Sequence, residues 1–492
     1  MADRPNLVFA FADQLRLQSC GYSDDYADDP DPYTSNVDRL AGESADFRQA
    51  VSGTPICAPY RSCLFTGKYA SSTGMVINEL RTMPDPDAVA HLLEEAGYRT
   101  AYVGKWHLYG TENSDADEHE FVPSGPYRLG FDDTWAAYNM NHDYYDGYYY
   151  EDDPERVEVD GYLPHAMTDR AVDFLERASE DDRPFALFVS YGPPHDPWTW
   201  DNVPDTFAHL FRDAAFPDPP NFESRGHARY WHPEMDEEWY EEEWCPDRER
   251  RRRVYAAQVA SLDWEVGRLL SAVDDLGLRE DTAVVFTSDH GEMFGSHGRV
   301  AKNVFYEEAV RVPFLLRYPG EVEPGVREAP LNTPDIAPTL LGLLDLPVPD
   351  SMEGTDLSHV ARGEDGPVPE AAFMQGMGHT FLWEDGNEWR GARDGRYTYA
   401  RWLDGEELLF DNVADPYQQE NLVGDPDYRE TLERLRAFVD DRIADLEDPF
   451  ERTTWYRDRW VEDRVIVRSA TRELPPERRP DSASTDGSSD RE

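Results

Sequence analysis

The segment Asn6-Leu-Val-Phe-Ala-Phe-Ala-Asp13-Gln14 joins an unbroken apolar run to an abrupt polar end. A short apolar run without polar alternation is consistent with a strand that is covered on both faces, as the strands of a parallel sheet are. A second run, Thr282 to Ser288, ends in the same way at Asp289-His290. Because ligands bind just beyond the carboxyl ends of the strands in open α/β sheets, these two ends predict a shared site.

Similar runs alternate with helical patterns elsewhere in the chain, which predicts βαβ units and a mostly parallel sheet. The further strands expected are Thr100 to Val103, Phe185 to Ser190 and Val312 to Arg317. The helices expected are Pro84 to Ala96, Ala166 to Ala178, Arg253 to Leu276, and one near Thr333, where Thr333-Pro334 supplies an N-cap and a favoured first helical residue. The expected fold class is therefore α/β, with an α/β/α sandwich.

Two stretches interrupt the alternation of strand and helix patterns, and we expect loop insertions there: Tyr109 to Pro164 and Trp198 to Arg252. Beyond about Gly366, shorter alternating runs with a hairpin signal at Asp394-Gly395 predict a small antiparallel sheet, and the pattern from Tyr428 to Leu446 predicts a helix that covers it. We expect three parts: a main domain over residues 1–365, a C-terminal subdomain over 366–470, and a disordered tail over 471–492.

The chain is strongly acidic, because 101 Asp and Glu residues against 47 Lys and Arg residues give a net charge of -54. Repulsion among so many carboxylates calls for abundant counter-ions, which predicts a salt-rich cytoplasm as the location. The same charge argues against nucleic acid or an anionic membrane as a partner. Four cysteines are too few for a disulfide framework, and the first apolar run is too short for a signal sequence or a membrane span.

Four of the expected strands lead into polar residues, at Asp13-Gln14, Lys105-Trp106-His107, His195 and Asp289-His290. Asp13, Gln14, Asp289 and His290 offer two carboxylates, an amide oxygen and an imidazole, a ligand set that suits a harder divalent cation. The two aspartates could equally cap the turns after their strands, and the residues alone leave both interpretations open.

The segment between the first two strands contains Cys57-Ala58-Pro59-Tyr60-Arg61. Pro59 favours the first turn of a helix, which places Cys57 near a helix N-terminus, where free N–H groups favour an anion. Arg61, about one turn later, can steady a negative charge on residue 57. The alternative is a buried structural cysteine beside a surface arginine.

Cys-x-Pro-x-Arg followed by Leu64-Phe-Thr-Gly-Lys68 resembles the signature of the type I sulfatases, members of the alkaline phosphatase-like superfamily. Further segments resemble that family's motifs in the family's order: the opening strand with Asp13-Gln14, Gly104-Lys105-Trp106-His107, Pro-Pro-His195, Ser288-Asp289-His290, and Lys302. The chain has only three lysines, Lys68, Lys105 and Lys302, and two of them fall on family sulfate sites. The chain differs from many members at Gln14, where they have Asp, and at Tyr60, where they have a small residue.

The resemblance implies an alkaline phosphatase-like fold with residues 1–365 as the catalytic domain. It implies that a formylglycine-generating enzyme oxidises Cys57 to formylglycine, whose hydrate attacks sulfur. The implied metal is one divalent ion, Ca²⁺ by preference and otherwise Mn²⁺ or Mg²⁺. Its implied ligands are Asp13, Gln14, residue 57, Asp289 and His290, and the implied catalytic residues are Cys57, Arg61, Lys105, His107, His195 and Lys302.

The implied substrate is a small-molecule or carbohydrate sulfate ester, with His195 as the general acid. A phosphonate or phosphate monoester hydrolase on the same fold is one alternative, and a non-catalytic anion-binding protein is another. The tyrosines at positions 144, 145, 148, 149 and 150 could stack on a sugar, face an organic cation, or belong to a salt-adapted surface. The sequence predicts no oligomeric state.

Overall fold

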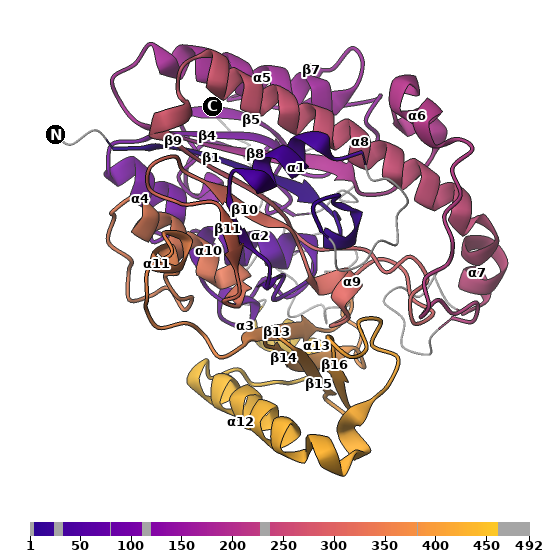
Figure 1. Ribbon diagram of the computed structural model, residues 1–492. Coiled ribbons are helices and arrows are strands. Elements are labelled where there is room, and N and C mark those ends of the chain that lie inside the picture. Colours follow the sequence, from indigo (N-terminus) through magenta and orange to yellow (C-terminus); the bar gives the residue numbers. More distant parts are fainter. Residues whose placement is uncertain are drawn as a thin grey trace, which may run out of the picture.

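The computed structural model describes residues 4–23, 33–78, 80–110, 120–226, 237–380 and 382–460. At its centre lies an eight-stranded sheet with the order β11-β2-β10-β9-β1-β8-β4-β5 (Figure 1). The five strands expected from the sequence are present as β1 (Asn6–Asp13), β4 (Arg99–Lys105), β8 (Phe185–Pro194), β9 (Thr282–Ser288) and β10 (Phe314–Arg317). Of these five, β4, β8, β1 and β9 pair in parallel in that order, and β10 pairs with β9 in antiparallel fashion.

The alternating side chains of β1 divide the interior into two cores. Leu7, Phe9 and Phe11 join one hydrophobic cluster, and Val8 and Ala10 join the other. A strand between two dry layers needs apolar residues on both faces, which explains the unbroken run. This arrangement confirms that the central sheet is covered on both sides.

Helices form the two outer layers. One face of the sheet is covered by α1 (Ser35–Gly42), α5 (Leu163–Ser179) and the long α8 (Cys245–Asp275) (Figure 1). The other face is covered by α2 (Cys57–Thr66), α4 (Val89–Glu95) and α10 (Thr333–Leu343). The α/β/α sandwich is therefore confirmed. Among the described residues, no helix has the length and hydropathy needed to cross a membrane.

The two predicted loop insertions contain regular structure, so this prediction was wrong in part. The first insertion contributes β5 (Thr134–Tyr138), which pairs with β4 at the edge of the main sheet. The second contains α6 (Asp205–Phe211), α7 (Glu237–Trp239) and the first residues of α8. The N-cap of α10 also differs from the prediction: it is Asn332, whose side chain accepts from Thr333 N, so Thr333 is already helical.

The smaller elements extend the main sheet or connect its layers. The strands among them are β2 (Ala45–Phe47), β3 (Ala50–Val51), β6 (Tyr148–Tyr149), β7 (Val157–Glu158), β11 (Gly325–Arg327) and β12 (Leu331–Asn332). The helices among them are α3 (Ala70–Thr73), α9 (Glu307–Val310), α11 (Ser358–Ala361) and α13 (Thr453–Trp460).

The predicted C-terminal sheet is present as β13 (Ala372–Met377), β14 (Glu388–Arg393), β15 (Tyr397–Trp402) and β16 (Glu407–Asp411), all antiparallel. One face packs on α12 (Arg429–Asp445), the predicted covering helix, and the other packs on the segment around α9 (Figure 1). The predicted disordered tail, 471–492, lies outside the described residues.

Candidate active site

The carboxyl ends of four strands meet at one edge of the main sheet. Asp13 is the last residue of β1, and Lys105 is the last residue of β4. Asp289 directly follows β9, and its backbone N–H donates to Ala12 O at 3.1 Å. His195 directly follows β8, whose last residue pairs with Asp13. The polar residues found after these strands in the sequence are thus brought together in space.

Glycine at position 104 permits the close approach of two of these strands. Gly104 has a φ of 108°, and a Cβ atom there would meet Ser190 O at 2.0 Å. Any other residue would force β4 away from β8 immediately before Lys105, because a clash of this depth with backbone cannot be relieved by a rotamer change.

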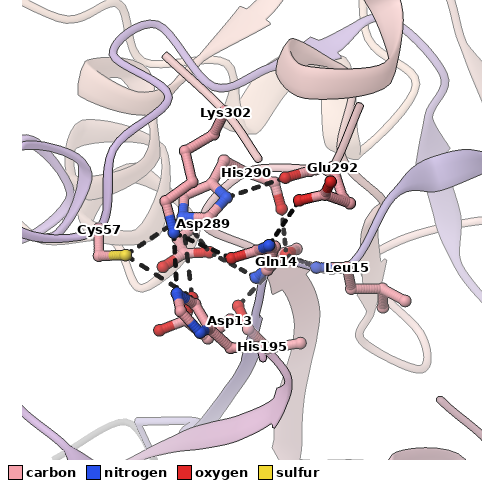
Figure 2. A network of polar contacts seen from close by, with 12 residues as sticks. Asp13, Gln14, Leu15, Cys57, His195, Asp289, His290, Glu292 and Lys302 are labelled. Atoms are coloured by element: carbon pink, nitrogen blue, oxygen red, sulfur yellow. Dashed lines mark hydrogen bonds and ion pairs between the residues drawn. The ribbon is translucent and has the colours of Figure 1, made fainter. Parts of the chain in front are cut away.

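Cys57 is the first residue of α2, as Pro59 in its first turn predicted. Its Sγ lies 3.2 Å from His290 Nε2 and 3.7 Å from Asp13 Oδ1 (Figure 2). Its side chain has no exposed surface. The helix start therefore directs residue 57 into the centre of the polar group.

Asp13 is held by two cations. Its Oδ2 accepts from Lys105 Nζ at 2.6 Å and from Arg61 Nη2 at 3.3 Å. Arg61 is itself fixed, because its Nη1 donates to Lys105 O at 2.6 Å and to Ser190 Oγ at 2.8 Å. Arg61 is fully buried, which excludes the surface position that the alternative reading of the cysteine segment required.

Four side chains could hold a metal ion. One donor atom from each of Asp13, Cys57, Asp289 and His290 lies within 4.8 Å of the others, and all four residues are buried. Within the part of the chain that the structure describes, Asp289 Oδ2 has no hydrogen-bond partner. The positive group beside this oxygen is Arg61, whose Nη2 lies 3.5 Å away and also faces Asp13 Oδ2 at 3.3 Å. A further cation would neutralise the buried charge that this shared guanidinium leaves uncompensated. The donor set therefore fits a divalent cation.

Gln14 lies beside this group but is engaged elsewhere. Its Oε1 accepts from Lys302 Nζ at 2.9 Å, and its Nε2 donates to Glu292 Oε2 at 2.6 Å (Figure 2). Its amide oxygen is therefore engaged by Lys302, and its amide nitrogen by Glu292. The backbone N–H of Gln14 donates to Asp289 Oδ1 at 3.0 Å, which joins the ends of β1 and β9.

The two site carboxylates have opposite pKa shifts. Burial alone would raise the pKa of Asp13, but nearby positive charges, Lys105 foremost, hold it well below its usual range. Burial and then the negative charge of Asp13 raise the pKa of Asp289. Two carboxylates this close do not both ionise readily without a compensating cation.

Cys57 is a poor nucleophile as it stands. Burial, and next the charge of Asp13, raise the pKa of the thiol to about 12. The thiolate is the reactive form of cysteine, so at neutral pH this thiol is almost entirely protonated. The helix start that favours an anion is thus outweighed by desolvation and by the adjacent carboxylate.

His195 and Lys302 form a second layer over the carboxylates. Lys302 Nζ lies 2.8 Å from His195 Nε2, and His195 Nδ1 lies 3.0 Å from Asp196 O. Burial, followed by the charges around it, lowers the pKa of His195 well below its usual range. His195 is therefore neutral at pH 7 in this state, with Nε2 accepting from the lysine.

His107 lies at the site without a side-chain anchor. Its backbone has a φ of 57°, and within the described residues its Nδ1 has no hydrogen-bond partner. Gln14, Ala301 and Asn303 also have positive φ. Left-handed backbone at several non-glycine residues costs free energy, and such strain clusters at functional sites.

The sequence did not identify every residue of this group. His142, from the first insertion, lies 2.9 Å from Lys105 Nζ through its Nε2, and its ring centroid lies 3.8 Å from that of His195. Glu292, three residues after Asp289, is a second such residue, and its Oε2 accepts from Gln14 Nε2 at 2.6 Å. By contrast, the tyrosines at positions 144, 149 and 150 are buried, so none of the three roles considered for them fits, whereas Tyr145 is 43% exposed.

Comparison with known proteins assigns the family. The model of the family described as Sulfatase matches residues 5–346. The chain belongs to the sulfatase family. A second model, described as N-sulphoglucosamine sulphohydrolase, C-terminal, matches residues 295–445 and so includes the C-terminal sheet.

Relatives of this sulfatase span almost the whole chain. An ulvan-active sulfatase of Formosa agariphila is 37% identical over 458 residues, covering 92% of this chain and 84% of that protein. An endo-4-O-sulfatase of Bacteroides thetaiotaomicron is 28% identical over 514 residues, covering 94% and 96%. The protein is therefore an enzyme, a sulfatase that hydrolyses sulfate esters.

Solved structures confirm the fold. One from work on the metabolism of multiple glycosaminoglycans by Bacteroides thetaiotaomicron superposes with a TM-score of 0.78 and 27% identity, covering 94% of this chain and 99% of that chain. A phosphonate monoester hydrolase of Agrobacterium radiobacter superposes with a TM-score of 0.66 at 21% identity, covering 92% and 97%. The second match shows that this fold alone does not separate the two chemistries.

Proposed function

We propose that this sulfatase removes sulfate from sulfated carbohydrates, using a formylglycine made from Cys57 and one divalent metal ion. The observation that carries the proposal is the position of Cys57. It begins a helix, it is fully buried, and its Sγ faces His290 and Asp13 at 3.2 and 3.7 Å.

The thiol is unsuited to attack sulfur, because it is protonated at neutral pH. Formylglycine, once hydrated, supplies two hydroxyl groups on one carbon, one to attack sulfur and one to let the sulfate be released. The same position also admits a metal ligand, since an oxygen there would stand beside Asp13 and His290.

Asp13, Asp289 and His290 would hold the metal, with residue 57 and the Gln14 amide oxygen completing the set. A bound divalent ion would supply Lewis acidity, withdrawing charge from the reacting oxygens. Calcium is favoured by the two carboxylates and the amide oxygen, and manganese is better matched to the imidazole. Within the described residues Asp289 Oδ2 accepts no hydrogen bond and has Arg61 Nη2 only at 3.5 Å, which supports occupancy by an ion.

The positively charged side chains of the site are proposed to bind the sulfate group. Lys105 and Lys302 are both buried, and they contact the neighbouring residues Asp13 and Gln14, so both can neutralise the oxygens of one sulfate group. Arg61, which donates to Asp13, supports negative charge near residue 57. His107 is buried within the electrostatic reach of Lys105, Arg61 and Asp13, and its Nδ1, which has no partner among the described residues, would accept a proton.

His195 is the proposed general acid. Its Nε2 accepts from Lys302, so the lysine can transfer a proton to Nε2, and the same nitrogen can then donate that proton to the departing ester oxygen, which leaves the lysine neutral. Its side chain is 8% exposed, whereas those of Asp13 and His290 are 0% exposed, so His195 stands on the solvent side of the site. A leaving alcohol on that side would meet it first.

Sulfated carbohydrates are proposed from the relatives. The similar proteins include the ulvan-active sulfatase, the endo-4-O-sulfatase and an N-acetylglucosamine-6-O-sulfatase. A choline-sulfatase of Rhizobium meliloti is 29% identical, so a small sulfate ester is the second substrate class to assay.

Peptide mass spectrometry and one pair of variants test the proposal. Wild-type protein should contain formylglycine at position 57 and hydrolyse nitrophenyl sulfate faster than nitrophenyl phenylphosphonate. Cys57→Ala should lose all sulfate-ester turnover and keep its melting temperature. The control is Cys63→Ala, another buried cysteine of α2, which should remain active. An active Cys57→Ala enzyme, or a preference for the phosphonate, would refute the proposal.

A further inference from the structure

The two sulfate-site lysines each contact a histidine, and the two histidines contact each other. Lys302 Nζ lies 2.8 Å from His195 Nε2, and Lys105 Nζ lies 2.9 Å from His142 Nε2. The rings of His142 and His195 have centroids 3.8 Å apart and are inclined by 33°. His142 therefore joins one sulfate-binding lysine to the residue proposed as the acid.

His142 comes from a segment that the sulfatase motifs do not include. It follows β5, the edge strand of the first insertion. Asn202, in the second insertion, donates from its Nδ2 to His142 O at 2.8 Å and to Pro197 O at 3.3 Å. Its Oδ1 accepts from Tyr144 N at 2.7 Å. The two insertions are thus fastened together beside His142 and the loop of His195.

The surroundings of the imidazole favour a neutral ring that accepts from Lys105. Burial, and then the charge of Lys105, lower the pKa of His142 well below its usual range. The positive groups that face it are Lys105, Lys302 and Arg61, and Asp13 is the negative group. A neutral imidazole has one acceptor nitrogen, and here that nitrogen is Nε2, directed at the lysine.

We propose that His142 is a positioning residue of this active site, acting on Lys105 through its Nε2 acceptor and on His195 through its ring face. The proposal rests on the sulfate-binding and acid roles given above to those two residues. Among the described residues, Asp13 Oδ2 is the other side-chain hydrogen-bond partner of Lys105 Nζ, so His142 fixes the second direction of the ammonium group. His195 is held at both nitrogens, and the tilted ring of His142 packed against it restricts the plane in which Nε2 points.

The two actions separate in the kinetics. Lys105 binds the sulfate group, which every substrate carries, so losing its acceptor should lower kcat/KM by a similar factor for all leaving groups. His195 serves the departing oxygen, so losing the ring packed against it should slow poor leaving groups more than good ones. General acid help is worth about 10²- to 10⁴-fold in full, and misplacing the acid forfeits part of it.

Two substitutions remove one action each. His142→Phe keeps an aromatic ring against His195 but offers Lys105 no acceptor. His142→Gln offers an amide oxygen close to the position of Nε2 but no ring. We expect His142→Phe to lower kcat/KM roughly five- to tenfold for nitrophenyl sulfate and for an alkyl or sugar sulfate alike, the value of about one hydrogen bond. We expect His142→Gln to lower the alkyl or sugar sulfate rate roughly tenfold more than the nitrophenyl sulfate rate.

The assay is a series of sulfate esters of graded leaving-group acidity, run with wild type, both variants and Cys57→Ala. A steeper leaving-group dependence in His142→Gln than in His142→Phe supports the proposal. Equal losses on every ester in both variants, with Cys57→Ala inactive, would show a merely structural histidine and overturn this role alone. A wild-type enzyme that cleaves none of the esters would overturn the proposed function and this role with it.

Discussion

A buried ion pair between the C-terminal sheet and the catalytic part offers a quantitative test of how the two are joined. Arg393, on β14, donates from Nε and Nη2 to the two carboxylate oxygens of Glu307, on α9, at 2.6 and 2.9 Å. The two side chains are 3% and 1% exposed. Removing Arg393 costs at most about 3–5 kcal/mol, because Glu307 is left charged and buried with Arg311, 3.6 Å away, as its remaining ion-pair partner among the described residues.

Arg393→Met should therefore lower the melting temperature by at most about 3–5 °C, taking an unfolding entropy of roughly 2.1 cal/mol/K per residue for one cooperative unit. The double variant Arg393→Met/Glu307→Gln should recover part of this loss, since no unpaired carboxylate remains. Scanning calorimetry of the wild type, both single variants and the double variant gives the interaction free energy between Arg393 and Glu307. The reasoning would be refuted if Arg393→Met were as stable as the wild type. It would also be refuted if the double variant were less stable than Arg393→Met.

The pH dependence of the Arg393→Met deficit has a definite sign. In the wild type, burial alone would raise the pKa of Glu307, but Arg393 outweighs it and the pKa lies below the usual value. That stabilisation is present above the unfolded pKa and is lost as pH falls through the folded pKa. Without Arg393, burial is opposed chiefly by Arg311 at 3.6 Å, so the pKa of Glu307 is higher than in the wild type and the cost of its buried charge grows as pH rises. The deficit should be larger at pH 8 than at pH 4.5, and the same calorimetry checks this.

Three further outcomes are expected. Chelation should abolish activity and calcium or manganese should restore it, while Asp289→Asn should raise the metal concentration needed for half activity, measured by titration of the metal-free protein; full activity without metal would contradict this. His195→Ala should reduce hydrolysis of an alkyl or sugar sulfate far more than that of nitrophenyl sulfate, so an unchanged ratio of the two rates would remove it as the acid. Because screening shortens from about 10 Å at 0.1 M salt to about 3 Å at 1 M, the net charge of -54 predicts a melting temperature that rises steeply with KCl, and a flat profile would disprove it.

Much of the scaffold was predictable because its strands are buried on both faces. The runs at Asn6 and Thr282 needed no partner to be recognised, and both begin at the predicted residue. β5 was missed, because Thr134-Trp-Ala-Ala-Tyr138 lies among polar and aromatic residues and is an edge strand with only one neighbour. Its assignment depends on pairing with β4, which is a tertiary contact that local sequence does not encode.

The active-site residues also fall into those that local sequence predicts and one that depends on tertiary contacts. Asp13, Lys105 and Asp289 could be found because they end apolar strands, and Cys57 because a proline follows it at helical spacing. His142 could not be found from its own neighbourhood, since nothing in Asn141-His-Asp143 distinguishes it from a surface loop. Its place follows from the contact between two insertions that are far apart in the sequence.

The complete burial of Cys57 also constrains the order of events in the making of this protein. No atom of its side chain reaches solvent, and its backbone is already committed to the first turn of α2. A maturation enzyme that must bind this segment cannot reach it after the protein has folded, because the segment is then buried between the sheet and the helices. If formylglycine is installed, it is installed on a chain that has not yet folded. Purified, folded protein that still carries cysteine should accordingly resist conversion in the test tube unless it is first unfolded.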